Sequence, residues 1–150
     1  MEIRRAAAAD LDGLVEVMEF HYRDEGEPLG EGHARRAVAG LLSDERSGRI
    51  WVLADGARVV GYLALTFGYS LELGGRDAFI DELYLLADWR GRGYGTRMIE
   101  MALAAAEEAG VVAVHLEVAP ENEGAESLYA RLGFEMRRYR LMIWRGGVRG

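Results

Sequence analysis

The segment at residues 90–95 is the part of the sequence best suited to hold a phosphate group. It reads Arg90-Gly91-Arg92-Gly93-Tyr94-Gly95, is followed by Thr96, and lies between an expected strand and a long expected helix. Glycines let the backbone approach a ligand closely, and a helix N-terminus adds free N–H groups and a partial positive charge. The side chains of Arg90 and Arg92 can add charge-assisted hydrogen bonds.

Two common nucleotide-binding motifs do not fit this segment. A P-loop needs a Gly-Lys-Ser/Thr sequence, and the chain contains no lysine. A dinucleotide fingerprint needs glycine at its first, third and sixth positions, whereas Thr96 is sixth when the count starts at Gly91. The remaining pattern, Arg-x-x-Gly-x-Gly, fits a phosphate-binding loop and an ordinary turn equally well when it is taken alone.

Asn122 is unusual because of the composition of the chain. All eighteen basic residues are arginine, glutamine is absent, and Asn122 is the only asparagine. A sequence that avoids asparagine so strongly has a reason to keep one, which makes Asn122 a candidate binding residue. The alternative is that Asn122 is a turn residue after Pro120, because asparagine is common in turns.

The expected secondary structure is that of one α/β domain spanning residues 1–150. The order is β-α-α-β-β-β-α-β-α-β, a mixed sheet with helices on its faces. Asp55-Gly56 is a strong signal for a hairpin turn, and Asp10 is a candidate N-cap of the first helix. In chain order the elements are strand 2–5, helices 11–22 and 33–42, strands 50–54, 58–66 and 78–86, helix 96–109, strand 111–118, helix 125–131 and strand 134–144.

Composition excludes several classes of protein. The net charge of −7 argues against general nucleic-acid binding, and the absence of cysteine excludes disulfides, thiolate metal sites and a cysteine nucleophile. No apolar run is long enough to cross a bilayer and the start lacks the apolar stretch of a signal peptide, so we expect a cytoplasmic protein without membrane contact. The histidines, His21, His33 and His115, lack metal-ligand spacing; we expect them to be structural and predict no metal.

In combination these segments resemble the GCN5-related N-acetyltransferase (GNAT) superfamily. The resemblance covers essentially the whole chain and is specific between residues 80 and 134. It implies a GNAT-like fold with a splayed central sheet, and direct acetyl transfer from acetyl-CoA to a primary amine without an acyl-enzyme. The motifs that carry it are Ile80-Asp81-Glu82-Leu83-Tyr84-Leu85, Asp88-Trp89 with the glycine-rich segment behind it, Asn122, and Leu128-Tyr129-Ala130-Arg131-Leu132-Gly133-Phe134.

The resemblance also implies roles for single residues in binding acetyl-CoA. The strand residues Leu83, Tyr84 and Leu85 would pair with the pantetheine arm as an added strand would, because that arm contains two amides. Asn122 would donate a hydrogen bond to the same arm. The pyrophosphate would be wrapped by the backbone of Arg90, Gly91, Arg92, Gly93, Tyr94, Gly95 and Thr96.

Tyr129 matches the family tyrosine that faces the cofactor sulfur. Attack on a thioester expels a thiolate, and a nearby phenol can donate a proton to it. The alternative is an aromatic side chain that packs its helix against the sheet.

Asp81 and Glu82 are the candidates for the base that accepts the proton of the amine. Strand alternation points them to opposite faces, so only one can face the active cleft. Glu82 is expected to share a face with Ile80 and Tyr84 and is preferred, although a β-bulge would reverse the choice. The alternative is that one acid is solvated and the other caps a loop.

The acceptor is narrowed to a primary amine: a small amine, a polyamine-like compound or a protein or peptide amine. Glu25, Glu27, Glu72 and Asp77 lie in expected loops that border the acceptor side of the resembled fold, and an acidic rim favours a positively charged amine. The alternative function is a non-catalytic acyl-CoA sensor on the same fold, against which Asn122 and Tyr129 together argue. A homodimer is expected from the family.

Overall fold

The structure is a computed structural model that describes residues 1–147 of the 150-residue chain. It divides into two compact units, Met1–Glu117 and the residues from Val118 onward. The first unit contains a five-stranded sheet and three α-helices, and the described part of the second contains one α-helix, α4 (Glu123–Arg131).

The sheet of the first unit has the strand order β1-β2-β3-β4-β5. The first four strands are antiparallel neighbours, and β5 runs parallel to β4, so the predicted mixed α/β sheet is confirmed. The elements are β1 (Glu2–Arg5), α1 (Leu11–Asp24), α2 (His33–Leu42), β2 (Gly48–Asp55), β3 (Arg58–Ser70), β4 (Gly75–Leu85), α3 (Tyr94–Glu108) and β5 (Ala113–His115), with 3-10 turns at Ala8–Asp10 and Ala87–Trp89.

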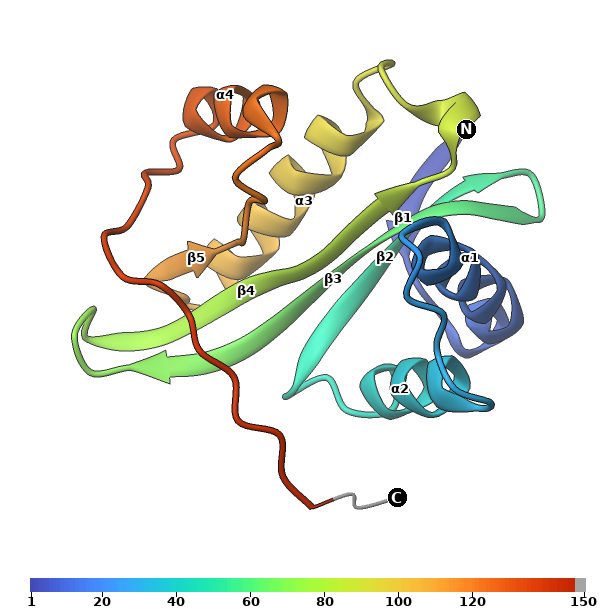
Figure 1. The fold of residues 1–150 in the computed structure, drawn as a ribbon, viewed down its shortest axis with the longest axis horizontal. Coiled ribbons are helices and arrows are strands. Elements are labelled where there is room, and N and C mark those ends of the chain that lie inside the picture. Colours follow the sequence, from blue (N-terminus) through green and yellow to red (C-terminus); the bar gives the residue numbers. More distant parts are fainter. Residues whose placement is uncertain (148–150) are drawn as a thin grey trace. The chain divides into compact units, whose positions relative to one another are not determined.

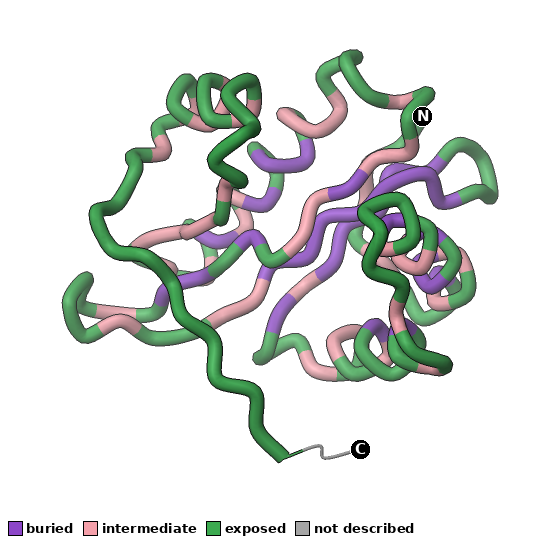
Figure 2. The backbone as a smooth tube through the Cα atoms, viewed as in Figure 1, coloured by how far each residue is buried: buried purple, intermediate pink, exposed green. Residues whose placement is uncertain are grey.

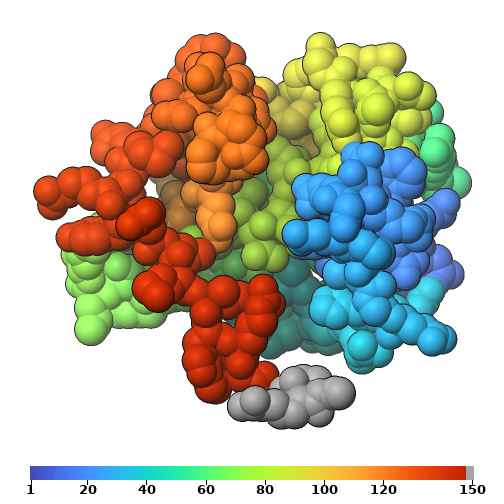
Figure 3. All heavy atoms as spheres, in the orientation of Figure 1, coloured from blue at the N-terminus to red at the C-terminus, as the bar shows by residue number. Residues whose placement is uncertain are grey.

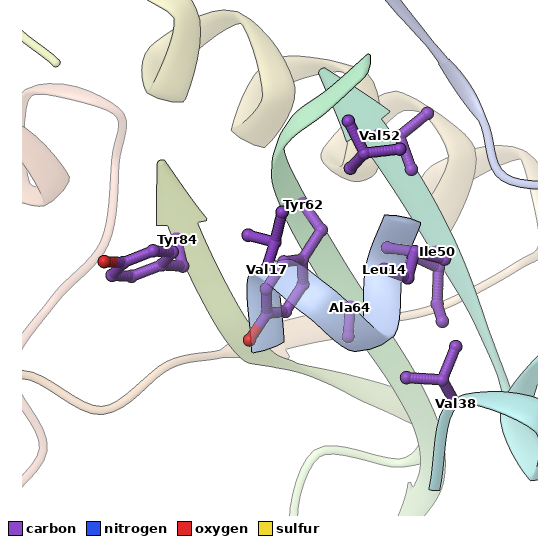
Figure 4. Packing of buried hydrophobic residues seen from close by; sticks show 9 residues of the cluster. Leu14, Val17, Val38, Ile50, Val52, Tyr62, Ala64 and Tyr84 are labelled. Atoms are coloured by element: carbon purple, nitrogen blue, oxygen red, sulfur yellow. The ribbon is translucent and has the colours of Figure 1, made fainter. Parts of the chain in front are cut away.

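Helices cover both faces of this sheet, with α1 and α2 on one face and α3 on the other (Figure 1). Figure 3 shows the atoms of α1 and α2 side by side on the face toward the viewer. Alternate strand residues face opposite sides, which divides the core into two parts. The longest runs of buried residues are 50–54 in β2 and 59–65 in the first half of β3 (Figure 2). The cluster under α1 and α2 is drawn in Figure 4 and includes Leu14, Val17, Val38, Ile50, Val52, Tyr62, Ala64 and Tyr84.

The predicted hairpin is confirmed, with Gly56 at a positive φ of 60° in its turn. Both β3 and β4 are longer than expected at the next turn, because the ladder runs on to the pair Ser70↔Gly75. Asp77 therefore lies in β4 and not in a loop. It is buried, and its Oδ2 lies 3.2 Å from Nε2 of His115, so it is not part of an acidic rim.

The predicted last strand, residues 134–144, is wrong. Residues 134–147 form neither helix nor strand, and the order ends β-α-β-α. Aromatic and β-branched residues favour a strand only where their backbone groups pair with a neighbour, and this stretch has no strand partner within the described part of the second unit. Met142 and Trp144 are accordingly among its exposed apolar side chains.

Asp10 joins the start of α1 to β1. Its Oδ2 accepts hydrogen bonds from the backbone N–H of Ala7 at 2.8 Å and from Arg4 at 2.7 Å, and its Oδ1 accepts from Arg4 at 2.9 Å. The predicted N-cap position is right, but the side chain does not cap α1. The hydrogen bond with Arg4 is the largest influence on the pKa of Asp10 and lowers it.

We expect Asp10→Asn to lower the free energy of unfolding by about 2 kcal/mol at pH 7, because it weakens a charge-assisted bidentate pair. A lowered folded-state pKa gives stability that is complete above the ordinary pKa of aspartate, about 3.9, and is lost as pH falls through the folded value. Urea unfolding at pH 7 and at pH 3 measures both. An equal difference between the two proteins at both pH values would contradict this role.

Candidate functional site

The glycine-rich segment forms the uncapped N-terminus of α3. Gly91 and Gly93 have positive φ angles of 73° and 85°, a conformation that glycine adopts without strain. Gly93 is the N-cap residue and no side chain caps the helix, so the first N–H groups of a 15-residue helix lack intrahelical acceptors. This geometry suits a phosphate group.

The start of α3 lies against the end of β4. A Cβ atom added to Gly95 would be 3.8 Å from Leu85 Cδ1 and 3.9 Å from Leu83 Cδ2, which is ordinary van der Waals contact. The structure therefore brings the expected pyrophosphate loop next to the expected pantetheine strand.

Arg90 does not direct its side chain as expected. Its Nε donates a hydrogen bond of 2.8 Å to the backbone oxygen of Leu85, and its guanidinium carbon lies 5.1 Å from the centre of the Tyr84 ring. These contacts hold the guanidinium beside the end of β4. Both Arg90 and Arg92 are exposed.

Strand β4 has an open edge along its second half. It pairs with β5 through Asp77↔Ala113, Ala78↔Val114 and Phe79↔His115, while its pairing with β3 continues to Leu85. From Ile80 to Leu85 the edge away from β3 has no partner in β5, which is the expected splay. An unpaired edge offers backbone N–H and C=O groups to an extended ligand that carries amides.

A β-bulge at Asp81 determines where the two candidate acids lie. Ala64 pairs with Glu82 and Leu65 pairs with Ile80, which leaves Asp81 as the extra residue. Paired residues share a face, so Glu82 shares a face with Ala64 and Tyr84, and Ile80 lies on the other. The expectation that Glu82 shares a face with Ile80 is wrong, yet the bulge keeps Glu82 on the α1 side.

Glu82 is held by two tyrosine hydroxyl groups. Tyr62 of β3 donates a hydrogen bond of 2.5 Å to Oε1, and Tyr22 of α1 donates one to Oε2. The side chain of Glu82 is 15% exposed. Burial, followed by the bond to Glu82, raises the pKa of Tyr22; burial and the charge of Glu82 raise that of Tyr62. Both phenols therefore keep their protons and act as donors to a carboxylate.

Asp81 has different surroundings. Desolvation, the charge of Glu82 and the charge of Glu117 raise the pKa of its carboxyl group, in that order of size. Neighbouring like charges favour the protonated form. Asp81 thus remains a candidate acid or base because its pKa is raised. Glu82 is the carboxylate whose orientation is fixed by hydrogen bonds from Tyr22 and Tyr62.

The comparisons with known proteins agree with this geometry. The model of the acetyltransferase (GNAT) family matches residues 14–134. The chain belongs to the GNAT acetyltransferase family. Acetyl-CoA is the acetyl donor in this family.

Relatives of this GNAT chain include an uncharacterized N-acetyltransferase of Methanocaldococcus jannaschii. It is 33% identical over 136 residues, and the match covers 89% of this chain but 60% of the relative. A thialysine N-epsilon-acetyltransferase of Mus musculus is 34% identical over 80 residues, 53% of this chain and 46% of the relative. An integron cassette protein from a salt-marsh metagenome has a similar structure, with a TM-score of 0.85, 32% identity and coverage of 95% of this chain and 89% of that one.

The second unit carries the two other predicted GNAT site residues. Asn122 is the N-cap of α4, where its Oδ1 accepts a hydrogen bond of 3.1 Å from the backbone N–H of Ala125. This bond uses the carbonyl oxygen and leaves the Nδ2 hydrogens as donors for a ligand. Tyr129 is half-buried and packs edge-on against Phe134, with 6.0 Å between ring centres, and burial raises the pKa of its phenol. Both roles remain predictions.

Beside α1 the first unit carries an open groove of about 470 Å³. Its lining includes Glu16, Asp24, Arg58, Tyr84 and Arg90, and it reaches neither Glu82 nor the glycines of the α3 N-terminus. Of the predicted cofactor-binding residues, Tyr84 and Arg90 line this groove and the others do not. Residues 1–147 contain no group of three or more potential ligands placed to hold a metal ion. None of the helices described is long and apolar enough to span a membrane.

The sequence did not identify Tyr22, Tyr62 or His21 as parts of this site. His21 and Glu25 are four residues apart on a helix, which places them on one face and was a readable signal. The contacts of Tyr22 and Tyr62 with Glu82 span 60 and 20 residues of sequence. They depend on the packing of α1 over β3 and β4, which no local pattern indicates.

We expect Gly93→Ala to weaken binding of coenzyme A severalfold. A Cβ at φ 85° is strained whatever the space around it, and the left-handed conformation costs a residue other than glycine about 1–2 kcal/mol. Relief of that strain would reorient the N–H groups that face the phosphate. Calorimetric titration measures the affinity. The matched control is Gly40→Ala, an exposed position inside α2 with open space; equal affinities of the two variants would contradict the proposed loop.

Proposed function

We propose that this chain is an acetyl-CoA-dependent N-acetyltransferase that transfers the acetyl group directly to a primary amine. The observation that carries the proposal is the position of Glu82. It is a carboxylate fixed by Tyr22 and Tyr62, and it lies on the same half of β4 that leaves an open edge. A base beside an extended-ligand edge is what amine acylation by a pantetheine thioester needs.

The donor side of the reaction is served by the first unit. The N–H groups at the start of α3 bind the pyrophosphate, and the open edge at Leu83–Leu85 pairs with the amides of pantetheine. Both contacts use the backbone, so they tolerate side-chain variation. For Asn122, in the second unit, the family resemblance implies a hydrogen bond from Nδ2 to the same arm.

The chemical step follows from the charges of these groups. Glu82 accepts the proton of the ammonium group, and the free amine nitrogen forms a bond to the thioester carbon. The carbon–sulfur bond then breaks, and the thiolate takes the hydroxyl proton of Tyr129, which is the role that the family resemblance gives this residue. The amide nitrogen loses its second proton to solvent, and the Tyr129 phenolate regains a proton from solvent. No acyl-enzyme is formed, since the nitrogen itself attacks the acetyl group.

A cationic small amine is the acceptor class we favour. Asp81, Glu82 and Glu117 interact electrostatically, and Asp24 and Glu25 lie at the end of α1, which supplies Tyr22 to Glu82. Such a concentration of negative charge favours a positively charged substrate. The name of the mouse relative adds support, because it specifies the side-chain amine of a cationic amino acid.

Incubation with acetyl-CoA and a panel of amines tests the proposal through release of free thiol. The panel contains thialysine, lysine, spermidine and a peptide with a free N-terminus. We expect turnover, fastest with the small cationic amines. Binding of acetyl-CoA without turnover on any amine would overturn the proposal and favour the acyl-CoA sensor.

Glu82→Gln and Asp81→Asn form a matched pair for the identity of the base. We expect Glu82→Gln to lower kcat by about 100-fold or more, because the amide keeps the shape but takes no proton. Asp81→Asn should lower it by less than about tenfold on the same scale. A larger loss in Asp81→Asn would transfer the role of the base to Asp81.

Tyr129→Phe should lower kcat by about 10- to 100-fold with little change in the KM for acetyl-CoA. The ring and its contact with Phe134 remain, while the proton donor is lost. Equal losses in turnover and cofactor affinity would make Tyr129 a packing residue.

The cytoplasmic location and the homodimer stay predictions. Light scattering of the purified protein measures its oligomeric state.

A further inference from the structure

A chain of hydrogen-bonding groups leads from Glu82 to the surface of α1. The hydroxyl of Tyr62, which donates to Glu82, lies 2.9 Å from Nδ1 of His21. The other ring nitrogen of His21, Nε2, lies 3.1 Å from Oε1 of Glu25. His21 is buried, whereas the side chain of Glu25 is 56% exposed. The chain therefore connects a carboxylate that is 15% exposed with solvent.

The ring of His21 is held in one orientation. It stacks on Tyr84 with 4.3 Å between ring centres and an angle of 18°, and it lies tilted against Tyr22 at 4.7 Å. The charged and titratable groups around it are Tyr22 of α1 and Glu25 at the C-cap of that helix, Tyr62 of β3, and Glu82 and Tyr84 of β4. A fixed ring with a polar partner at each nitrogen can pass a proton between them.

The donors and acceptors along the chain allow a proton to move in one direction. Tyr62 has a single hydroxyl proton, which lies toward Oε1 when Glu82 is charged. Once Glu82 has taken a proton, it can donate to the Tyr62 oxygen while the hydroxyl of Tyr62 donates to Nδ1. Both phenols keep their protons at neutral pH, and Nδ1 of His21 is the next acceptor along the chain.

We infer that His21 is a positioning residue that regenerates Glu82 by accepting its proton through Tyr62. In one shift the O–H bond of Glu82 breaks as Tyr62 gains that proton, and the O–H bond of Tyr62 breaks as Nδ1 gains the other. The product is a carboxylate and an imidazolium, stabilised by Glu25. The imidazolium then loses its Nε2 proton to solvent beside Glu25, and the neutral ring keeps the proton on Nδ1, which it donates to the oxygen of Tyr62. Exchange of the ring protons with solvent restores the Nε2–H form before the next transfer. This inference rests on the proposed function of Glu82 as base.

The first test needs no substrate and so separates this inference from the proposed function. Protein labelled with ¹⁵N in its histidine rings is compared with Tyr62→Phe and Glu82→Gln by NMR at neutral pH. We expect both substitutions to shift the Nδ1 resonance of His21. The ring of His115, which contacts Asp77 and Phe79 instead, is the internal control and should not respond. An Nδ1 resonance that ignores Glu82→Gln would overturn the relay.

The second test uses acetyl-CoA and the panel amine that reacts fastest. We expect His21→Gln to lower kcat by about 10- to 100-fold with unchanged KM for acetyl-CoA, since glutamine keeps a polar contact but relays no proton. The dependence of kcat on the D₂O fraction should be curved in the wild type and linear in the variant. His33→Gln, an exposed histidine at the start of α2, is the matched control.

Added imidazole should restore part of the turnover of His21→Ala, in which a small base can enter the space left by the ring. Thermal unfolding of both variants shows whether they are folded at the assay temperature. A folded His21→Gln with wild-type turnover would overturn the inference, as would a curved D₂O dependence that survives the substitution.

Discussion

The unequal pairing of β4 with its two neighbours is the constraint on which the candidate site depends. One edge of β4 is paired with β3 along its whole length, while the other meets β5 through three residue pairs. Backbone groups inside a sheet are almost always paired, so an edge that β5 leaves unpaired from Ile80 to Leu85 requires a ligand, water, another strand or a side chain, as Arg90 provides at the carbonyl of Leu85. The position of α3 against Leu83 and Leu85 places a phosphate-binding helix start at the same edge.

The bulge at Asp81 makes the same strand serve a second purpose. Without the bulge, strict alternation would run through residues 80–84. Ile80, Glu82 and Tyr84 would then share one face of β4, and Asp81 would lie on the other. The extra residue lets Ile80 remain in the apolar layer opposite Leu65 while Glu82 turns toward α1. There the tyrosines of α1 and β3 meet it. The bulge at Asp81 thus lets β4 contribute Ile80 to the apolar core and Glu82, two residues later, to a polar cluster on the other face.

The sequence predicted the elements with strong local signals and failed where pairing decides. Gly56 and Gly93 each adopt a backbone conformation that few other residues adopt. The turn at Asp55-Gly56 was predicted correctly, while the helix after the glycine-rich segment was predicted to begin at residue 96 and begins at Tyr94. The stretch at residues 134–144 has the composition of a strand, but composition cannot supply a partner for its backbone. Asp77 was assigned to a loop because the signal of glycines around residue 74 masked the length of the hairpin.

The site was predictable to the same extent, because contacts along the chain are visible in a sequence and contacts across the sheet are not. Glu82 and the glycine loop lie within one short segment, and both could be named as candidates from the sequence. His21 looked isolated, since its partners Tyr62 and Tyr84 come from other strands. Its importance emerges only when the charges of the cluster are compared. Because burial raises the pKa values of Tyr22, Tyr62 and Tyr84, these three phenols stay neutral while a proton passes. When Glu82 gains a proton, the group that takes this proton on must then be the imidazole or another acid. Among these groups, His21 is the one that Tyr62 connects to Glu82.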